Sequence, residues 1–96
     1  MKMKLSGKEI FQIEKTAKAL ANHQRVKILY LLEDKEETSL GEIADSFNKD
    51  YKTIAEHLRR LVLGGLVHKR RAGIMVYFRL SPLGEKILKL LPQMLS

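Results

Sequence analysis

Two short segments of this chain are rich in side chains that donate hydrogen bonds, and many of these side chains are positively charged. Lys and Arg donors suit phosphate oxygens and the acceptor atoms of guanine, while a Thr methyl group suits the methyl group of thymine. The chemistry these residues favour is therefore recognition of a polyanion. The first segment supplies the donors Lys49, Tyr51, Lys52, Thr53, His57 and Arg60 together with the carboxylate of Glu56, which only accepts hydrogen bonds, and the second supplies Lys69, Arg70 and Arg71.

Bond-making chemistry has no comparable support. The chain has no cysteine, which excludes disulfides, thiolate metal sites and cysteine nucleophiles. His23, His57 and His68 stand at no helical i, i+3 or i+4 spacing, so a zinc site would require three distant segments to converge. There is no glycine-rich phosphate loop and no nucleophile motif. We expect no catalytic residue, no metal site and no cofactor, and hence a protein that is not an enzyme.

The charge of the chain is unevenly distributed. Residues 1–48 hold eight Lys or Arg and eight Asp or Glu, whereas residues 49–96 hold ten and three, so the net charge of +7 lies entirely in the second half. A concentrated positive field attracts polyanions and speeds encounter with them. The half that contains both donor-rich segments is therefore the half that suits nucleic acid.

The first donor-rich segment lies on the second of two closely spaced helices. Ser39 and Glu42 form a capping box that starts a short helix, which the run 48–50 breaks. Asp50 can cap the next helix, over residues 51–63. The apolar residues of this second helix, Ile54, Leu58 and Leu61, recur on one side and are expected to face inward. The hydrogen-bond donors are therefore left on the other side.

The second donor-rich segment lies on a β-hairpin. Residues 66–71 and 74–80 read as two strands joined at Ala72-Gly73, with Val76, Phe78 and Leu80 sharing one face. Arginine at a hairpin tip can clamp phosphates or enter a narrow minor groove.

Helices on either side should hold this unit in place. Residues 8–21 have helical apolar spacing, Asn22 can cap a helix over 23–33, and Ser81 can cap a last helix that Pro92 ends. A core this small cannot absorb every apolar side chain of the terminal helices, so we expect a homodimer. The residues predicted at its interface are Phe11, Leu90, Leu91, Met94 and Leu95.

The major groove of B-form DNA admits one α-helix, and residues near the N-terminus of the second helix of such a pair meet the base edges. We therefore expect Lys52, Thr53 and Glu56 near bases, and Lys49, Tyr51 and Arg60 near phosphates. His57 is a boundary residue or a phosphate donor. Glu56 either reads a base or forms an ion pair with Lys52 or Arg60, and we favour the ion pair.

Three stretches together resemble the ArsR-like winged-helix repressors. Residues 19–29 (ALANHQRVKIL) resemble that family's LADPTRLRIL block, and residues 51–61 (YKTIAEHLRRL) resemble its recognition helix in the form common among archaeal members. The segment from Gly65-Leu66-Val67 to Tyr77-Phe78-Arg79-Leu80 resembles its wing. MarR-type proteins share the wing.

The resemblance implies a mainly α winged helix-turn-helix of order α-α-α-α-β-β-α. It also implies a homodimer formed by the first and last helices, an inverted-repeat DNA site, and repression relieved by an inducer. The chain departs from the family where the cysteine-bearing metal motif begins, because Leu40-Gly41-Glu42-Ile43 stands there. The last helix also lacks the Asp and His ligand pairs of metal sensors, so any inducer is an unknown small molecule.

We thus expect one DNA-binding domain over 1–96, with the helix-turn-helix at about 39–63, the wing at about 66–80, and dimerisation helices at about 8–21 and 82–95. The predicted function is a sequence-specific transcriptional regulator of double-stranded DNA, acting as a homodimeric repressor. The alternatives are a low-specificity architectural DNA binder and a winged helix that binds only protein. With no signal peptide, no membrane span and no cysteine, we expect a cytoplasmic protein, nucleoid-associated when bound to DNA.

Overall fold

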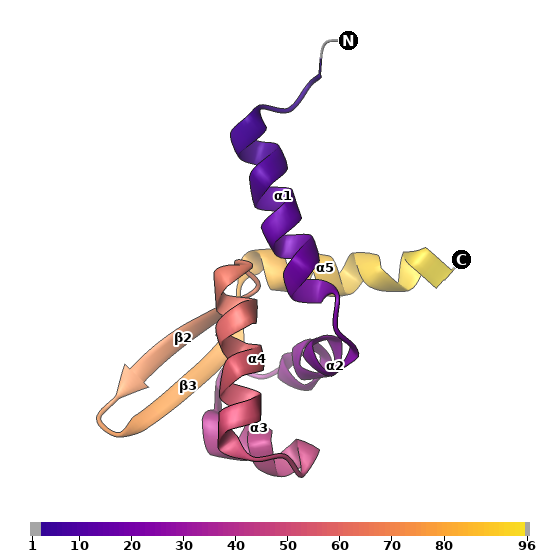
Figure 1. Cartoon of the computed structure of the whole chain (residues 1–96). Coiled ribbons are helices and arrows are strands. Elements are labelled where there is room, and N and C mark those ends of the chain that lie inside the picture. The colour runs from indigo at the N-terminus through magenta and orange to yellow at the C-terminus, as the bar shows by residue number, and fades with distance from the viewer. Residues whose placement is uncertain (1–2, 96) are drawn as a thin grey trace.

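The computed structural model describes residues 3–95, and these form a winged helix-turn-helix (Figure 1). Met1, Lys2 and Ser96 lie outside the described residues, so the ends of the expected 1–96 domain do too. No helix within residues 3–95 is both long and apolar enough to cross a membrane. The elements in chain order are α1 (Gly7–Leu20), α2 (His23–Leu32), β1 (Thr38–Ser39), α3 (Leu40–Phe47), α4 (Tyr51–Leu63), β2 (Val67–Ala72), β3 (Met75–Leu80), α5 (Pro82–Leu90) and the 3₁₀ helix η1 (Leu91–Leu95).

Local capping chemistry starts each helix. The predicted caps Asn22, Ser39, Asp50 and Ser81 all accept hydrogen bonds from backbone N–H groups of the first helical turn, and Ser39 completes its capping box with Glu42. A further capping box, Ser6 with Glu9, starts α1 and was not predicted. These side chains satisfy N–H groups that have no partner within the helix.

The sheet differs from the expected hairpin in two respects. The two residues of β1 add a third strand, giving the antiparallel order β1-β3-β2. The prediction that Ala72-Gly73 forms the turn was wrong by one residue, because Ala72 pairs with Met75 and the loop is Gly73-Ile74. Gly73 has φ +61°, and glycine is favoured where a two-residue hairpin loop needs a positive φ.

The core lies between α2, α3, α4 and the inner face of the sheet. Its fully buried members come from every layer, and the predicted inward residues of α4 are among them. Phe78 and Leu80 point inward from β3, as the alternation predicts, while Val76 packs partly against the core. The largest fully buried side chains are Ile28, Leu29, Leu32, Ile43, Ile54, Leu58, Leu61, Leu66 and Val67.

Helix α1 stands clear of this body over its N-terminal half, and α5 with η1 projects to the side (Figure 1). The molecule is therefore elongated, with principal extents of 50 × 32 × 22 Å. The C-terminal half of α1 is fixed to the end of α4, where the buried hydroxyl of Thr16 donates to the Gly64 carbonyl oxygen at 2.9 Å. Gly64 permits this approach, since a Cβ there would lie 2.5 Å from the Cβ of Ala19.

Candidate nucleic-acid interface

Helix α4 separates its anchoring side chains from its donors. Ile54, Leu58 and Leu61 are at most 1% exposed, so they fix the helix rigidly against the core. Six of the seven predicted residues in and before α4 are exposed, and His57 is half-buried. The exposed six are Lys49, Tyr51, Lys52, Thr53, Glu56 and Arg60.

The start of α4 is set by the turn from α3. Asn48 ends α3 in the left-handed conformation, with φ 52°, and Asp50 then accepts the backbone N–H of Thr53 at 2.7 Å. That hydrogen bond holds the pKa of Asp50 below its usual value, so the cap stays ionised at neutral pH. The Tyr51 hydroxyl reaches Gly41 on α3, where a Cβ would lie only 2.8 Å from it. The first turn of α4 is thus held by its own cap and by α3.

The predicted ion pair of Glu56 exists, but the predicted partners were wrong. Glu56 pairs with Arg59, whose Nε lies 2.7 Å from Oε1 and whose Nη2 lies 3.0 Å from Oε2. The planar guanidinium matches the two carboxylate oxygens, and three residues along a helix is a neighbouring position. This hydrogen bonding lowers the pKa of Glu56 below its ordinary value.

His57 connects α4 to the helices behind it. Nη1 of Arg25 lies 3.4 Å from Nδ1 of His57, while Nε and Nη2 of the same arginine donate to the carbonyl oxygens of Ala19 and Lys18. Arg25 thereby caps the C-terminus of α1 and contacts α4. Burial, and next the charge of Arg25, lower the pKa of His57, so its ring is neutral at neutral pH and can accept.

The three predicted wing cations lie on β2 and are all exposed. Lys69 pairs with Phe78 and Arg71 with Val76, and neither cation forms an ion pair within residues 3–95. Arg70 differs, because its guanidinium forms a two-point ion pair with Glu37 and lies over the ring of Tyr77. The sequence alone did not distinguish Arg70 from Lys69 and Arg71 in this way.

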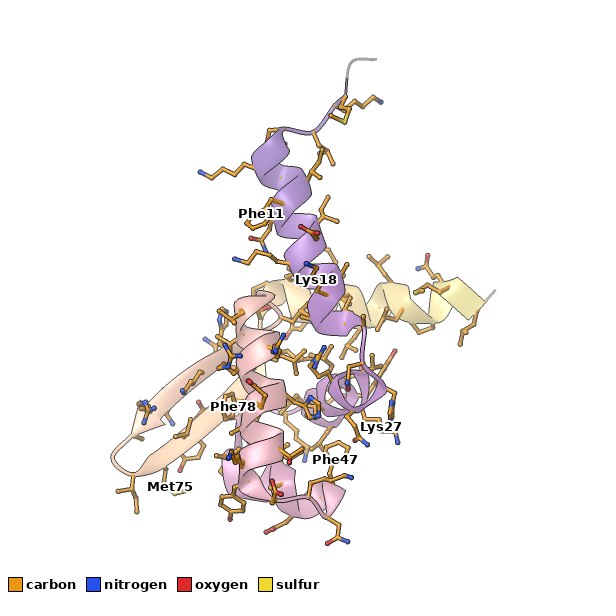
Figure 2. The ribbon with its side chains drawn as sticks, in the orientation of Figure 1. Phe11, Lys18, Lys27, Phe47, Met75 and Phe78 are labelled. Carbon is orange, nitrogen blue, oxygen red and sulfur yellow. The ribbon has the colours of Figure 1, made fainter. Side chains whose placement is uncertain are left out.

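The predicted dimer residues lie on α1, α5 and η1. Phe11 projects from the part of α1 that stands clear of the other helices (Figure 2). Four of the five are more than 45% exposed, namely Phe11, Leu90, Met94 and Leu95. Leu91 is instead half-buried and packs partly against the core.

An apolar groove of about 620 Å³ is lined by three of these residues, Leu91, Met94 and Leu95, and no described residue fills it. A second, of about 390 Å³, is lined by Ile13 and Ala17 on α1 and by Leu83 and Ile87 on α5. The apolar stripe of α1 is therefore directed largely toward open grooves rather than into the core. The lining of the larger groove includes Leu20, Val26, Tyr30, Leu91, Met94 and Leu95.

Sequence reasoning missed three contributors to this surface: Arg25, Glu37 and Arg59. Glu37 and its partner Arg70 are 33 residues apart, so no local spacing could reveal the pair. Arg25 likewise reaches His57 across 32 residues. Arg59 alone carried a local signal, because it lies three residues after Glu56 on the same helix.

Comparison with known proteins identifies the sequence pattern of "Bacterial regulatory protein, arsR family" over residues 22–69. The HTH-type transcriptional regulator KmtR of Mycobacterium tuberculosis is 30% identical over 77 residues, which cover 80% of this chain and 58% of KmtR. The transcriptional activator HlyU of Vibrio cholerae is 36% identical over 64 residues, covering 67% of this chain and 58% of HlyU. The chain thus spans a little over half the length of each of these two relatives.

A solved structure matches over nearly the whole chain. It is the solution structure of the homodimeric winged helix-turn-helix DNA-binding domain Mb0332 from Mycobacterium bovis, described as a possible ArsR-family transcriptional regulator. It is 31% identical, with a TM-score of 0.77, and the match covers 98% of this chain and 89% of that one.

Proposed function

Because the chain belongs to the ArsR family of bacterial regulatory proteins, we propose that it binds double-stranded DNA as a homodimer and represses transcription from an inverted-repeat site. Its relatives are transcriptional regulators rather than enzymes. The observation that carries the proposal is that α4 is amphipathic, with fully buried apolar side chains on one side and exposed hydrogen-bond donors on the other. The exposed cations of the wing add further positive charge to the molecule's surface.

Each polar side chain of this surface takes the role that its position allows. Lys52, Thr53 and Glu56 face outward near the start of α4, where such helices meet base edges. Lys49, Tyr51 and Arg60 contact phosphates, and so do Lys69, Arg70 and Arg71 from the wing. His57, being half-buried and held by Arg25, positions α4 rather than reaching deeply into the groove.

The homodimer follows from the apolar surface of α1, α5 and η1. A two-fold axis through this surface would present two copies of α4 on one side, and half-sites about one helical turn apart would then form an inverted repeat. The homodimeric state of Mb0332, a 31% identical neighbour, supports this assembly.

We also propose that neither α3 nor α5 holds a metal ion as an inducing signal. In support, the chain has no cysteine, and Leu40 and Gly41 occupy the start of α3. No group of three or more His, Asp or Glu in residues 3–95 is arranged to hold a metal ion. The resemblance of α4 to archaeal members remains a prediction, since the relatives named above are bacterial.

Selection of bound fragments from sheared genomic DNA, followed by sequencing, tests the proposal. A recurrent inverted repeat is expected. Lys52→Ala should then change the preferred base pairs, whereas Arg71→Ala should weaken binding to all sequences alike. Enrichment without a motif would favour the low-specificity binder, and no enrichment would favour a protein-binding module.

Repression is tested separately by transcription in vitro from a promoter that overlaps the selected site. Adding the protein should lower the transcript yield. Increased yield would contradict the repressor assignment and would match the activator role that is named for HlyU.

A further inference from the structure

Among the ion pairs of residues 3–95, Arg70 is the one predicted wing cation that takes part. Its Nε lies 2.8 Å from Oε2 of Glu37, and its Nη2 lies 2.7 Å from Oε1. The guanidinium carbon also lies 4.8 Å from the centre of the Tyr77 ring. The Nε and Nη2 donors of this arginine and one face of its guanidinium plane are therefore engaged within the chain.

The sheet brings these three side chains together. Tyr77 on β3 pairs with Arg70 on β2 on one side and with Ser39 on β1 on the other, and Glu37 directly precedes β1. The carboxylate thus approaches the wing from across β3. Hydrogen bonding from Arg70 lowers the pKa of Glu37, so it is ionised at neutral pH, and the pair remains partly exposed, at 29% for Glu37 and 55% for Arg70.

We propose that Glu37 competes with DNA phosphate for Arg70 and thereby sets how strongly the wing binds any duplex, an inference that rests on the function proposed above. An arginine fork that holds a carboxylate at two points cannot hold a phosphate at the same two donors. A two-point phosphate contact through Nε and Nη2 therefore requires the guanidinium to leave Glu37. The carboxylate left behind faces the phosphates and repels them. Glu37 limits affinity without contributing to sequence choice.

Glu37→Gln tests this proposal, and Glu36→Gln is its matched control. Both changes remove one negative charge from the same loop, but Glu36 is exposed and has no ion pair within residues 3–95. Affinity for a mixed-sequence duplex is measured by fluorescence anisotropy at low and high salt. Glu37→Gln should bind more tightly at low salt. Because salt screens the repulsion between the Glu37 carboxylate and the phosphates, the affinity advantage of Glu37→Gln should shrink between about 50 and 200 mM salt.

A double-mutant cycle assigns the effect to the pair. In a protein that also carries Arg70→Gln, Glu37→Gln should no longer raise the affinity for DNA by more than Glu36→Gln does. Equal gains in DNA affinity from the two Glu variants, when Arg70 itself is unchanged, would overturn the proposal. Weaker binding by Glu37→Gln would also overturn it, because it would mean that Glu37 holds Arg70 in a productive position. If the wild-type protein fails to bind duplex DNA, the proposed function itself is contradicted and this inference falls with it.

A measurement on the unaltered protein does not depend on the folding of any variant. The carboxyl pKa of Glu37 is followed by NMR with and without duplex. When DNA binds, loss of the hydrogen bonds from Arg70 should raise the pKa of Glu37 from its lowered value. A pKa of Glu37 that does not change on binding would show that the ion pair persists in the complex and would refute the exchange.

Discussion

Truncation of Phe11 should weaken the homodimer without unfolding the chain. Phe11 is 60% exposed on α1, at the part of the helix that stands clear of the body, so Phe11→Ala removes little packing within one chain. In a two-fold dimer the same change occurs twice, once on each protomer. The dissociation constant of the dimer should therefore respond strongly to a substitution that barely alters the monomer.

The size of the effect follows from the exposed area. Full burial of a Phe side chain stabilises by about 1.5–3 kcal/mol, so the exposed 60% of Phe11 can contribute about 1–2 kcal/mol on each protomer. Two copies contribute about 2–4 kcal/mol. Since each 1.4 kcal/mol is about tenfold in an equilibrium constant, dimer dissociation should become about 30- to 700-fold more favourable.

Sedimentation equilibrium over a range of concentrations measures this constant. Ile74→Ala is the matched control, because Ile74 is an apolar side chain that is 98% exposed at the tip of the wing, away from α1 and α5. It should leave dimerisation unchanged. A Phe11→Ala protein that dimerises like the wild type would refute the placement of Phe11 at the interface, and a wild-type chain that stays monomeric at micromolar concentration would refute the dimer.

Three other predictions follow from single contacts. Glu56→Gln should release Arg59 and strengthen binding to all duplexes in a gel shift, whereas loss of discrimination at one base pair would show that Glu56 reads a base. Gly84→Ala should lower the free energy of unfolding measured in urea, because the added Cβ would lie 2.2 Å from the Leu66 carbonyl oxygen. Such overpacking costs about 1–3 kcal/mol, against about 1 kcal/mol gained in helix propensity. Unchanged stability would contradict the tight packing. The pKa of His57 is lowered in the folded chain, so its stabilising contribution is complete above its unfolded pKa near 6.5 and is lost as the pH falls through its folded pKa. In urea titrations from pH 7.5 to 5, His57→Gln should flatten that decline, and an unaltered pH profile would contradict the assignment.

The parts of this fold that the sequence predicted are those that depend on neighbouring residues. Caps such as Ser39 and Asp50 act within three residues, and the anchor of α4 repeats at helical spacing, so both could be identified without the fold. The exposure of the α4 donors then follows, because a helix buried on one side presents the other side to solvent.

The parts that could not be predicted depend on contacts between distant segments. The strand β1 has two residues and no pattern of its own, and it forms only because β3 lies beside it. Its position brings Glu37 to Arg70, and the packing of α2 against α4 brings Arg25 to His57. The partner of Glu56 was mistaken for a different reason, since several cations lie within reach and the side-chain conformations select Arg59.

NMR titration of the isotope-labelled protein with its selected duplex would test the claim that α4 and the wing are the DNA-binding surface. The largest chemical-shift changes should fall at residues 49–60 and 69–71, and the methyl group of Thr53 should show contacts with base protons. Changes centred on Met94 and Leu95, with α4 unaffected, would contradict the account.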